Sequence, residues 1–244
     1  MEITTFIVNL KTSFKRKEYI KNLLSDYPNL LLNFIEAVDG RILSEETRNS
    51  IFDSERSLSR YGKKMNPGEI GCTLSHLKCY NQLIQSSLDY VLILEDDISI
   101  VGDMEPILKD EITTFMKDSA PKILFLSGDY WHWDKKRITR VFSAVGSYAY
   151  FINQAAAKLI LSNVSKPYHV ADDWDLYKSF GVKLYALYPY IIDANIADIP
   201  SDIQQEYWGN KKSLMSWNNR AQSLYRGIVK RILCRSGYFE SKKR

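Results

Sequence analysis

Residues 90–97, Tyr-Val-Leu-Ile-Leu-Glu-Asp-Asp, constrain the fold more than any other segment of this chain. Their first five positions are apolar or aromatic without alternation, which is typical of a strand buried on both faces of a parallel sheet. Three consecutive carboxylates follow, although adjacent acids repel one another at the end of a core strand. In open α/β sheets, ligands bind beyond the carboxyl ends of the strands, so we expect a ligand site here. Clustered carboxylates suit a hard divalent cation that holds a phosphate-bearing substrate.

The remaining sequence alternates between strand and helix patterns. Strands are predicted at 3–10, 30–38, 122–127, 138–142, 147–152 and 182–192, and helices at 16–25, 67–85, near 105–116, at 153–161 and 172–180. This alternation predicts an α/β sandwich with a mainly parallel central sheet flanked by helices. Residues 53–66 are polar with little periodicity, and we expect them to form a loop.

The charge distribution separates a body from a tail. Residues 217–244 contain eight Lys or Arg and one Glu, a net +7, whereas the whole chain of 244 residues carries only +4, which leaves −3 for the rest. We therefore expect a domain at residues 1–210 and a basic amphipathic tail at 211–244. The acidic body contains no recognised nucleic-acid-binding module, so we expect no nucleic-acid partner.

The cysteines and the N-terminus bear on the compartment. Cys72, Cys79 and Cys234 are too few and too unevenly placed for a disulfide framework or a zinc site. The N-terminus has neither a basic leader nor an apolar segment of signal-peptide length. No run approaches the roughly 20 apolar residues that span a bilayer. These features favour a cytoplasmic, reducing location.

Glu95 and Asp97 are the candidate metal ligands. Side chains two apart in an extended segment share a face, so Glu95 and Asp97 can point together while Asp96 turns away and supports them. Oxygen ligands of this kind suit Mn²⁺ or Mg²⁺, and the sequence does not choose between them. The alternative is a solvated acidic turn after the strand.

The helix predicted to begin at Pro67 has glycines in its first turn. Each interior Gly costs a helix about 1 kcal/mol, so Gly68 and Gly71 suggest that something approaches the backbone closely near the helix N-terminus. That end of a helix suits a phosphate or a carboxylate. Ser75 and His76 lie about two turns further on. As sequence neighbours they point in different directions, and a purely structural role for His76 is the alternative.

Five segments in a fixed order carry a resemblance to a known family. They are Asn9-Leu10 with Arg16, Ala37–Gly40, Pro67–His76, Ile93–Asp97 and Gly146–Ile160. Over about residues 3–190, the chain resembles glycosyltransferase family 25, the bacterial lipooligosaccharide galactosyltransferase type. The resemblance implies a GT-A-like nucleotide-sugar-binding fold and transfer of a hexose, usually galactose from UDP-galactose, with inversion.

The resemblance also implies site residues. The positions that match the family and are expected to bind substrate or nucleotide are Asn9, Arg16, Asp39, Glu69, Ser75, His76 and Asp96. Trp131-His132-Trp133 and the basic tail depart from the family pattern, so the acceptor stays open. Trp131 and Trp133 are a candidate stacking platform for an acceptor sugar, or alternatively cover an edge of the core.

Asp172 and Asp173 are the candidate catalytic residues. An inverting transfer needs a carboxylate that removes the proton of the acceptor hydroxyl as its oxygen attacks the anomeric carbon. The two acids lie beside Trp174, downstream of the acidic strand. The alternative is that Asp172 caps the following helix.

The tail contains an amphipathic pattern. Leu224, Tyr225, Ile228, Val229, Ile232 and Leu233 fall on one helical face, with Arg226 and Lys230 opposite. A basic amphipathic helix is typical of a membrane-surface anchor, and each Lys or Arg near an anionic bilayer contributes roughly 1 kcal/mol. We expect peripheral contact with the inner face of the cytoplasmic membrane. The alternative is a helix docked on its own domain.

These patterns together predict an inverting, metal-dependent glycosyltransferase. Its partners would be a UDP-sugar donor and a glycan or glycolipid acceptor such as lipooligosaccharide. Two other classes fit the same residues. One is a nucleotide-sugar hydrolase or pyrophosphatase that uses the same acids. The other is a non-catalytic glycan-binding protein at the membrane surface.

Overall fold

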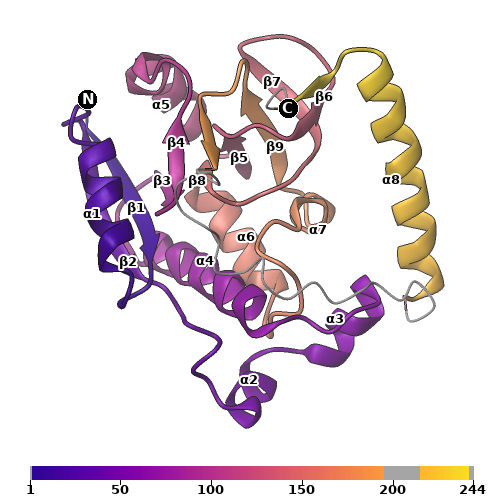
Figure 1. Ribbon diagram of the computed structural model, residues 1–244. Helices are drawn as coiled ribbons and strands as arrows, with labels where there is room; N and C mark the ends of the chain where they lie inside the picture. The colour runs from indigo at the N-terminus through magenta and orange to yellow at the C-terminus, as the bar shows by residue number, and fades with distance from the viewer. Residues whose placement is uncertain (1, 195–214, 242–244) are drawn as a thin grey trace.

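The computed structural model describes residues 2–194 and 215–241. Within these residues, nine strands form one sheet with helices on both faces, so the predicted α/β sandwich is confirmed (Figure 1). The strand order is β11-β6-β7-β9-β5-β8-β3-β1-β2. The strands are β1 (Ile3–Asn9), β2 (Leu30–Glu36), β3 (Tyr90–Glu95), β5 (Lys122–Phe125), β6 (Tyr130–His132), β7 (Ile138–Ala144), β8 (Ala149–Asn153), β9 (Lys183–Leu187) and β11 (Phe239–Glu240).

Shorter elements complete the fold. β4 (Ile98–Ile100) and β10 (Ile192–Ala194) pair as a small second sheet. The helices are α1 (Phe14–Leu23), α2 (Glu45–Ile51), α3 (Ser54–Tyr61), α4 (Pro67–Gln85), η1 (Glu105–Leu108), α5 (Asp110–Lys117), α6 (Gln154–Asn163), α7 (Trp174–Ser179) and α8 (Trp217–Arg235).

The large sheet is mixed, with most strands in one direction. β1 pairs in parallel with β2 and β3, and β5 pairs in parallel with β9. β8 lies antiparallel between β3 and β5, and β7 lies antiparallel to both β9 and β6. Following these pairings through the described part of the chain, most of the strands run the same way. The carboxyl ends of β1 and β3 therefore meet at one edge of the sheet.

β3 lies inside the sheet and is covered on both faces. Val91 and Ile93 pack toward α4 and α6, whereas Leu92 and Leu94 pack toward α1 and α5, and all four are fully buried. Burial on both faces explains why the strand shows no polar alternation.

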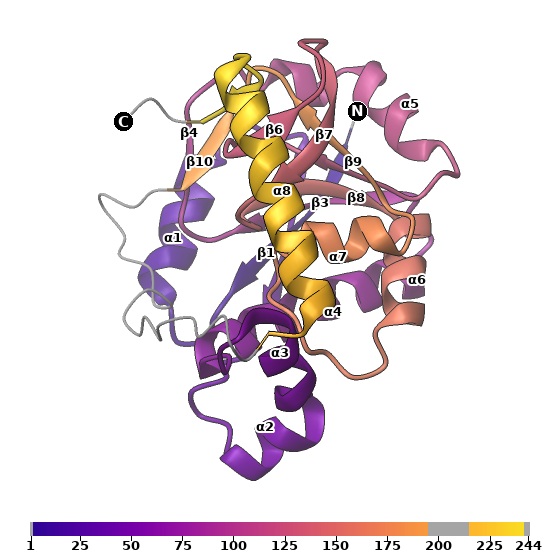
Figure 2. The same cartoon turned by 90° about the vertical axis from the view of Figure 1, so that its right-hand side faces the viewer.

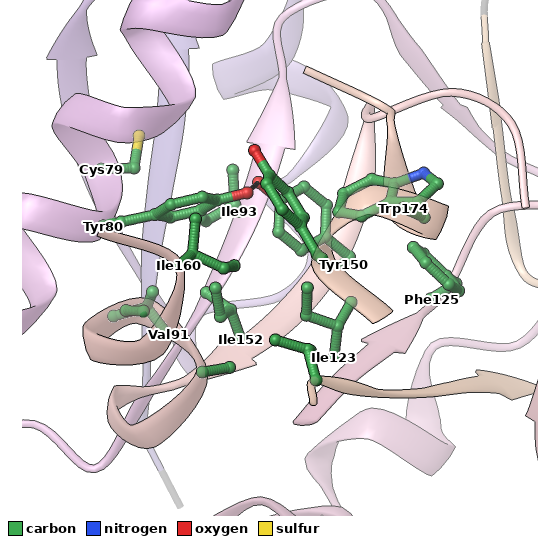
Figure 3. Close-up of a cluster of buried hydrophobic side chains, with 14 of the residues drawn as sticks. Cys79, Tyr80, Val91, Ile93, Ile123, Phe125, Tyr150, Ile152, Ile160 and Trp174 are labelled. Carbon is green, nitrogen blue, oxygen red and sulfur yellow. Dashed lines mark hydrogen bonds between the residues drawn. The ribbon is translucent and has the colours of Figure 1, made fainter. Parts of the chain in front are cut away.

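The core beside α4 contains paired hydroxyl groups. Figure 3 shows Tyr80 and Tyr150 among the aliphatic side chains of the sheet, where their hydroxyl oxygens lie 2.8 Å apart. Both rings are fully buried, so this hydrogen bond satisfies groups that water cannot reach. The Tyr150 hydroxyl also lies 2.7 Å from Nδ1 of His76 and thus connects the core to the edge where β3 ends.

α4 begins at Pro67, as the sequence predicts. Its Gly71, however, is approached by the protein's own backbone and not by a ligand. Asn66 and Glu69 form a reciprocal capping box around Pro67. A Cβ on Gly71 would lie 2.4 Å from the carbonyl oxygen of Val38. The close approach inferred from this glycine is therefore made by the chain's own loop after β2, and the contact fixes that loop against the helix.

Two element predictions were wrong. Part of the segment expected to be a loop is α3, capped by Asp53 at its start and ended by Gly62 with a φ of 69°. Ser57 is its one buried residue, so the helix lacks the buried apolar stripe that would reveal it. The strand expected at 182–192 is divided into β9 and β10, because Pro189 between them lacks the N–H that a ladder needs.

The C-terminal segment lies on the outside of the body. Figure 2 shows α8 running along one side of the molecule from α3 to β6. β11 then pairs with β6 and extends the large sheet. The expected boundary at 210/211 lies outside the described residues. None of the described helices is both long enough and apolar enough to cross a bilayer.

Candidate active site

The three acids lie where the carboxyl ends of β1 and β3 meet. Glu95, the last residue of β3, is in register with Val8, and Asn9 ends β1 beside it. Asp96 and Asp97 form a turn that leads into β4. The expected strand alternation therefore does not extend to Asp97, and the turn determines where each carboxylate points.

Asp96 and Asp97 share one cation from α1. Asn9 donates its Nδ2 hydrogen to Asp96 at 2.6 Å. The Arg16 guanidinium lies 3.2 Å from a carboxylate oxygen of Asp96 and 3.3 Å from one of Asp97. The family positions at Asn9 and Arg16 are thus brought directly to the acids.

Glu95 points toward α4. His76 Nε2 lies 3.3 Å from its Oε1, and the Ser147 hydroxyl donates to the same oxygen at 2.7 Å. His76 has no exposed surface, and its other ring nitrogen contacts Tyr150. His76 is therefore a buried residue that orients Glu95, which fits the structural alternative.

The three acids differ electrostatically. Burial raises the pKa of Asp97 to about 7, with Glu95 and Asp96 adding repulsion and Arg16 partly offsetting it. Burial also raises the pKa of Asp96, although Asn9 and Arg16 oppose this. For Glu95, burial is outweighed by His76, Ser147 and Arg16, which lower the pKa. The charge of Arg16 therefore does not fully offset the burial of Asp96 and Asp97.

A cleft of about 640 Å³, including its solvent-filled mouth, opens beside the acids. Besides Glu95, its lining includes five of the predicted site residues: Arg16, Asp39, Ser75, Asp96 and Asp97. The pKa of Asp39 is lowered, chiefly by its side-chain hydrogen bonds with Arg41. The Ser75 hydroxyl donates to Gly71 O and accepts from Val38 N, so it ties the loop after β2 to α4.

Cys72 is a site residue that sequence reasoning missed. It lines the cleft, and ligand atoms of Cys72, His76 and Glu95 all lie within 4.8 Å of one another. Burial raises the pKa of its thiol, and the charges of Glu95, Asp172 and Asp97 raise it further. The thiol therefore lies beside Glu95 in the cleft. Its spacing of four residues from His76 on one helix was the available signal.

Asp172 is a fourth carboxylate, whose charge acts on the Cys72 thiol. The backbone N–H of Gly146 donates to its Oδ2 at 2.9 Å. Gly146 has a φ of 82°, which favours glycine, and its carbonyl accepts from the Trp174 indole at 3.0 Å. Burial raises the pKa of Asp172, and the charges of Asp173 and Glu95 add to the effect, while the hydrogen bond from Gly146 opposes it.

Asp173 is engaged elsewhere. Its carboxylate caps α7, accepting from Leu176 N, and pairs with two nitrogens of the Arg60 guanidinium at 2.5 and 2.9 Å. The Tyr61 hydroxyl donates to it as well. Burial opposes ionisation, but Arg60 and Tyr61 outweigh it and lower the pKa of Asp173. The capping role considered for Asp172 therefore belongs to Asp173.

Glu69, Trp131 and Trp133, which were also predicted to belong to the site, take no part in the contacts described for the acids. Glu69 completes the capping box and pairs with Lys63 at 2.6 Å. The Trp131 ring stacks on that of Phe239, with the ring centres 4.6 Å apart, and so holds the C-terminal segment against the body. Trp133 is half-exposed and packs edge-on against Phe142.

The acidic edge has the donor set of a divalent-cation site. Glu95, Asp96 and Asp97 offer carboxylate oxygens on one cleft, and the raised pKa values of Asp96 and Asp97 reflect burial that Arg16 does not fully offset. Oxygen ligands fit Mg²⁺ or Mn²⁺. Cys72 and His76 add softer ligands beside Glu95. An anionic cleft of this kind can hold a cation with a diphosphate, while Asp172 can accept a proton.

Comparison with protein families gives a match over most of the chain. Residues 2–174 match the model of glycosyltransferase family 25, described as an LPS biosynthesis protein.

Related proteins share only part of their length with this chain. A provisionally named glycosyltransferase of Haemophilus influenzae is 25% identical over 181 residues, covering 72% of this chain and 63% of that protein. A glycosyltransferase 25 family member of Drosophila melanogaster is 36% identical over 98 residues, or 38% of this chain and 16% of its own length. Human procollagen galactosyltransferase 2 is 29% identical over 98 residues, 38% and 15% of the two chains. This chain thus spans less than two thirds of the length of these relatives.

Solved structures match this chain only at low sequence identity and low TM-score. A mutant form of Drosophila β1,4-galactosyltransferase 7, in complex with manganese, UDP-Gal and xylobiose, matches with a TM-score of 0.44, 10% identity and coverage of 88% and 79%. The galactosyltransferase LgtC with donor and acceptor sugar analogues has a TM-score of 0.38, 10% identity and coverage of 75% and 73%.

Proposed function

The chain belongs to glycosyltransferase family 25, and from this premise we propose that it transfers a hexose with inversion from a nucleotide sugar to a glycan. The observation that carries the proposal is the gathering of Glu95, Asp96 and Asp97 along one cleft, together with Asp172, whose charge acts on Cys72 in the same cleft. This arrangement suits a donor diphosphate at the three acids and an acceptor hydroxyl at Asp172.

We place the donor in the cleft beside the acids. Asp39 and Arg16 line it and would contact the nucleotide and diphosphate, with Asn9 holding Asp96 in place. Glu95 and Asp97 would hold Mn²⁺ or Mg²⁺, with Asp96 as support. A bound cation would act as a Lewis acid for the departing nucleoside diphosphate. Arg16, already between Asp96 and Asp97, is placed to bind an anionic oxygen once a cation satisfies those acids.

We assign the general base to Asp172. Its Oδ2 is held by the Gly146 N–H, and we assign Oδ1 to accept the acceptor proton. Its raised pKa makes it a stronger base than an ordinary aspartate. Asp173 is unsuited to this role because Arg60 and Tyr61 occupy its carboxylate oxygens. Asp173 instead positions Asp172 by anchoring the start of α7.

Galactose is the proposed hexose and UDP-galactose the donor. Relatives named as procollagen galactosyltransferases support galactose, and the family description as an LPS biosynthesis protein supports a lipooligosaccharide or other cell-surface glycan as acceptor. Trp133, half-exposed just after β6, is the better stacking candidate because Trp131 is covered by Phe239. We assign transfer to residues 1–210 and place the protein at the cytoplasmic face of the membrane.

Product analysis tests the proposal. Purified protein with Mn²⁺, a lipooligosaccharide-type acceptor and a panel of UDP-hexoses should form a glycoside and release UDP in equal amounts, fastest with UDP-galactose. Free hexose or sugar phosphate without glycoside would establish a hydrolase or pyrophosphatase. Glycan binding with no turnover across the panel would establish a binding protein and refute transfer.

A further inference from the structure

The C-terminal helix docks on the body with its cationic side. Arg226 pairs with Asp175 of α7 at 3.3 Å, and the Lys230 ammonium lies 4.0 Å from the centre of the Trp131 ring. Leu233, which the sequence pattern groups with the apolar face, is instead buried on this side, and Asn219 donates to Ser59 O of α3 at 3.1 Å. The polar side of α8, which amphipathic helices usually turn to solvent, therefore faces the protein.

The apolar side of α8 is consequently turned outward. Its large side chains are strongly exposed: Trp217 84%, Leu224 69%, Tyr225 62%, Ile228 50% and Ile232 57%. At about 100° per residue, these positions fall within a sector of about 100°, along a helix about 28 Å long. The result is a continuous apolar stripe, which we call the outer stripe. Scattered surface apolar residues need no explanation, but a continuous stripe does.

The charged side chains of α8 are all positive. α8 contains no Asp or Glu. Arg231 and Arg235 are exposed, and helical geometry places Arg235 in line with Trp217 and Arg231 at the border of the sector. Arg226 and Lys230 on the inner side are already engaged by Asp175 and by the Trp131 ring. The outward face thus combines aromatic and aliphatic side chains with arginine.

We propose that the outer stripe of α8 lies in the surface of an anionic lipid bilayer. Apolar side chains would enter the boundary between headgroups and acyl chains, while Arg231 and Arg235 would contact lipid phosphates. A second copy of this stripe would cover the apolar atoms but would leave the flanking arginines without complementary charge. The ring of Trp217 and the phenol of Tyr225 are of the kind enriched at such interfaces.

The way α8 lies on the body would bring the membrane close to the proposed acceptor side of the site. The inner face of α8 contacts α7, which begins just after Asp172, and the charges of Asp175 and Asp172 both act on the pKa of Lys230. A bilayer against α8 would therefore present lipid-linked glycans on the side that carries Asp172. This last step, and only this step, rests on the proposed transferase function.

Vesicle sedimentation tests the inference without any turnover. The full chain should sediment with phosphatidylglycerol–phosphatidylcholine vesicles and far less with phosphatidylcholine alone. L224S/I228S should weaken binding about tenfold or more, because the apolar contribution is lost. R231Q/R235Q should weaken binding to the anionic vesicles only. The control V101S removes a side chain as exposed as Ile228, in the loop after β4, and should bind as the original chain does.

Three outcomes would overturn the proposal. One is the absence of binding to anionic vesicles, and another is binding that L224S/I228S leaves unchanged. The third is a dimer in sedimentation velocity that L224S/I228S dissociates, which would assign the outer stripe to a second copy. Transfer to a soluble glycan should persist in L224S/I228S. Absence of transfer in every variant would refute the proposed function and leave the vesicle result standing.

Discussion

Asp172 and Asp173 are neighbours in sequence, and the structure predicts opposite consequences for changing each to Asn. Asp173 is the anchor. Its carboxylate forms two hydrogen bonds with Arg60, and the side chains of Asp173 and Arg60 are only 8% and 15% exposed. Removing one partner of a buried pair leaves an uncompensated charge at a cost of about 3–5 kcal/mol. Asn still caps a helix, so we expect D173N to lower the free energy of unfolding by about 3 kcal/mol.

D172N should leave stability nearly unchanged. The amide oxygen of Asn can still accept from Gly146 N–H, and burial already disfavours the charged form of Asp172. We therefore expect a change of about 0.5 kcal/mol or less in the free energy of unfolding. An amide cannot accept the acceptor proton, so kcat should fall by about 10²–10⁴.

Both variants are measured by urea denaturation, followed by tryptophan fluorescence, and by UDP release at saturating donor. The exposed Asp26 provides the matched control D26N, which should change neither quantity. A D172N protein with kcat within tenfold of the original would remove Asp172 from the mechanism. A D173N protein that is fully stable but inactive would transfer the catalytic role to Asp173.

Three further predictions concern other parts of the protein. D97N should weaken Mn²⁺-dependent UDP binding more than about tenfold in calorimetry and leave metal-free binding unchanged, whereas equal loss in both would contradict its role as a ligand. G71A should lower the free energy of unfolding by about 1–3 kcal/mol, because its Cβ would meet Val38 O at 2.4 Å; an unchanged urea midpoint would refute that contact. Burial lowers the pKa of His169 to about 4 from 6.5, so the unfolded chain takes up a proton first as pH falls. The His169 contribution to stability should therefore drop by about 2 kcal/mol between roughly pH 7.5 and pH 5, and H169Q should remove this part of the pH dependence of urea unfolding.

The architecture was predictable because it rests on burial. The apolar run of β3 required cover on both faces, and Asn66 with Glu69 marked the start of α4 through local hydrogen bonds. α3 was missed because its single buried residue, Ser57, gives no apolar period. Patterns within a short stretch of sequence thus predicted most of the helices and strands.

The site was predictable as a region and less so in its details. The acids and Arg16 were foreseen from segments far apart in sequence, but their partners depend on how a turn directs each side chain. Cys72 joins them only because α4 packs against the end of β3. The roles of Asp172 and Asp173 depend on Arg60, which is distant in sequence. The orientation of α8 likewise depends on its ion pair with Asp175, which periodicity alone does not reveal.

Inverting transfer is tested most directly by the identity of the first product formed from UDP-galactose and a glycan acceptor with Mn²⁺, observed by proton NMR during the reaction. Inversion predicts one new galactoside per UDP released, with a β anomeric signal, since the donor linkage is α. D172N should slow the appearance of this signal without changing its configuration. An α-linked first product, or free galactose in place of a glycoside, would contradict inverting transfer by this chain.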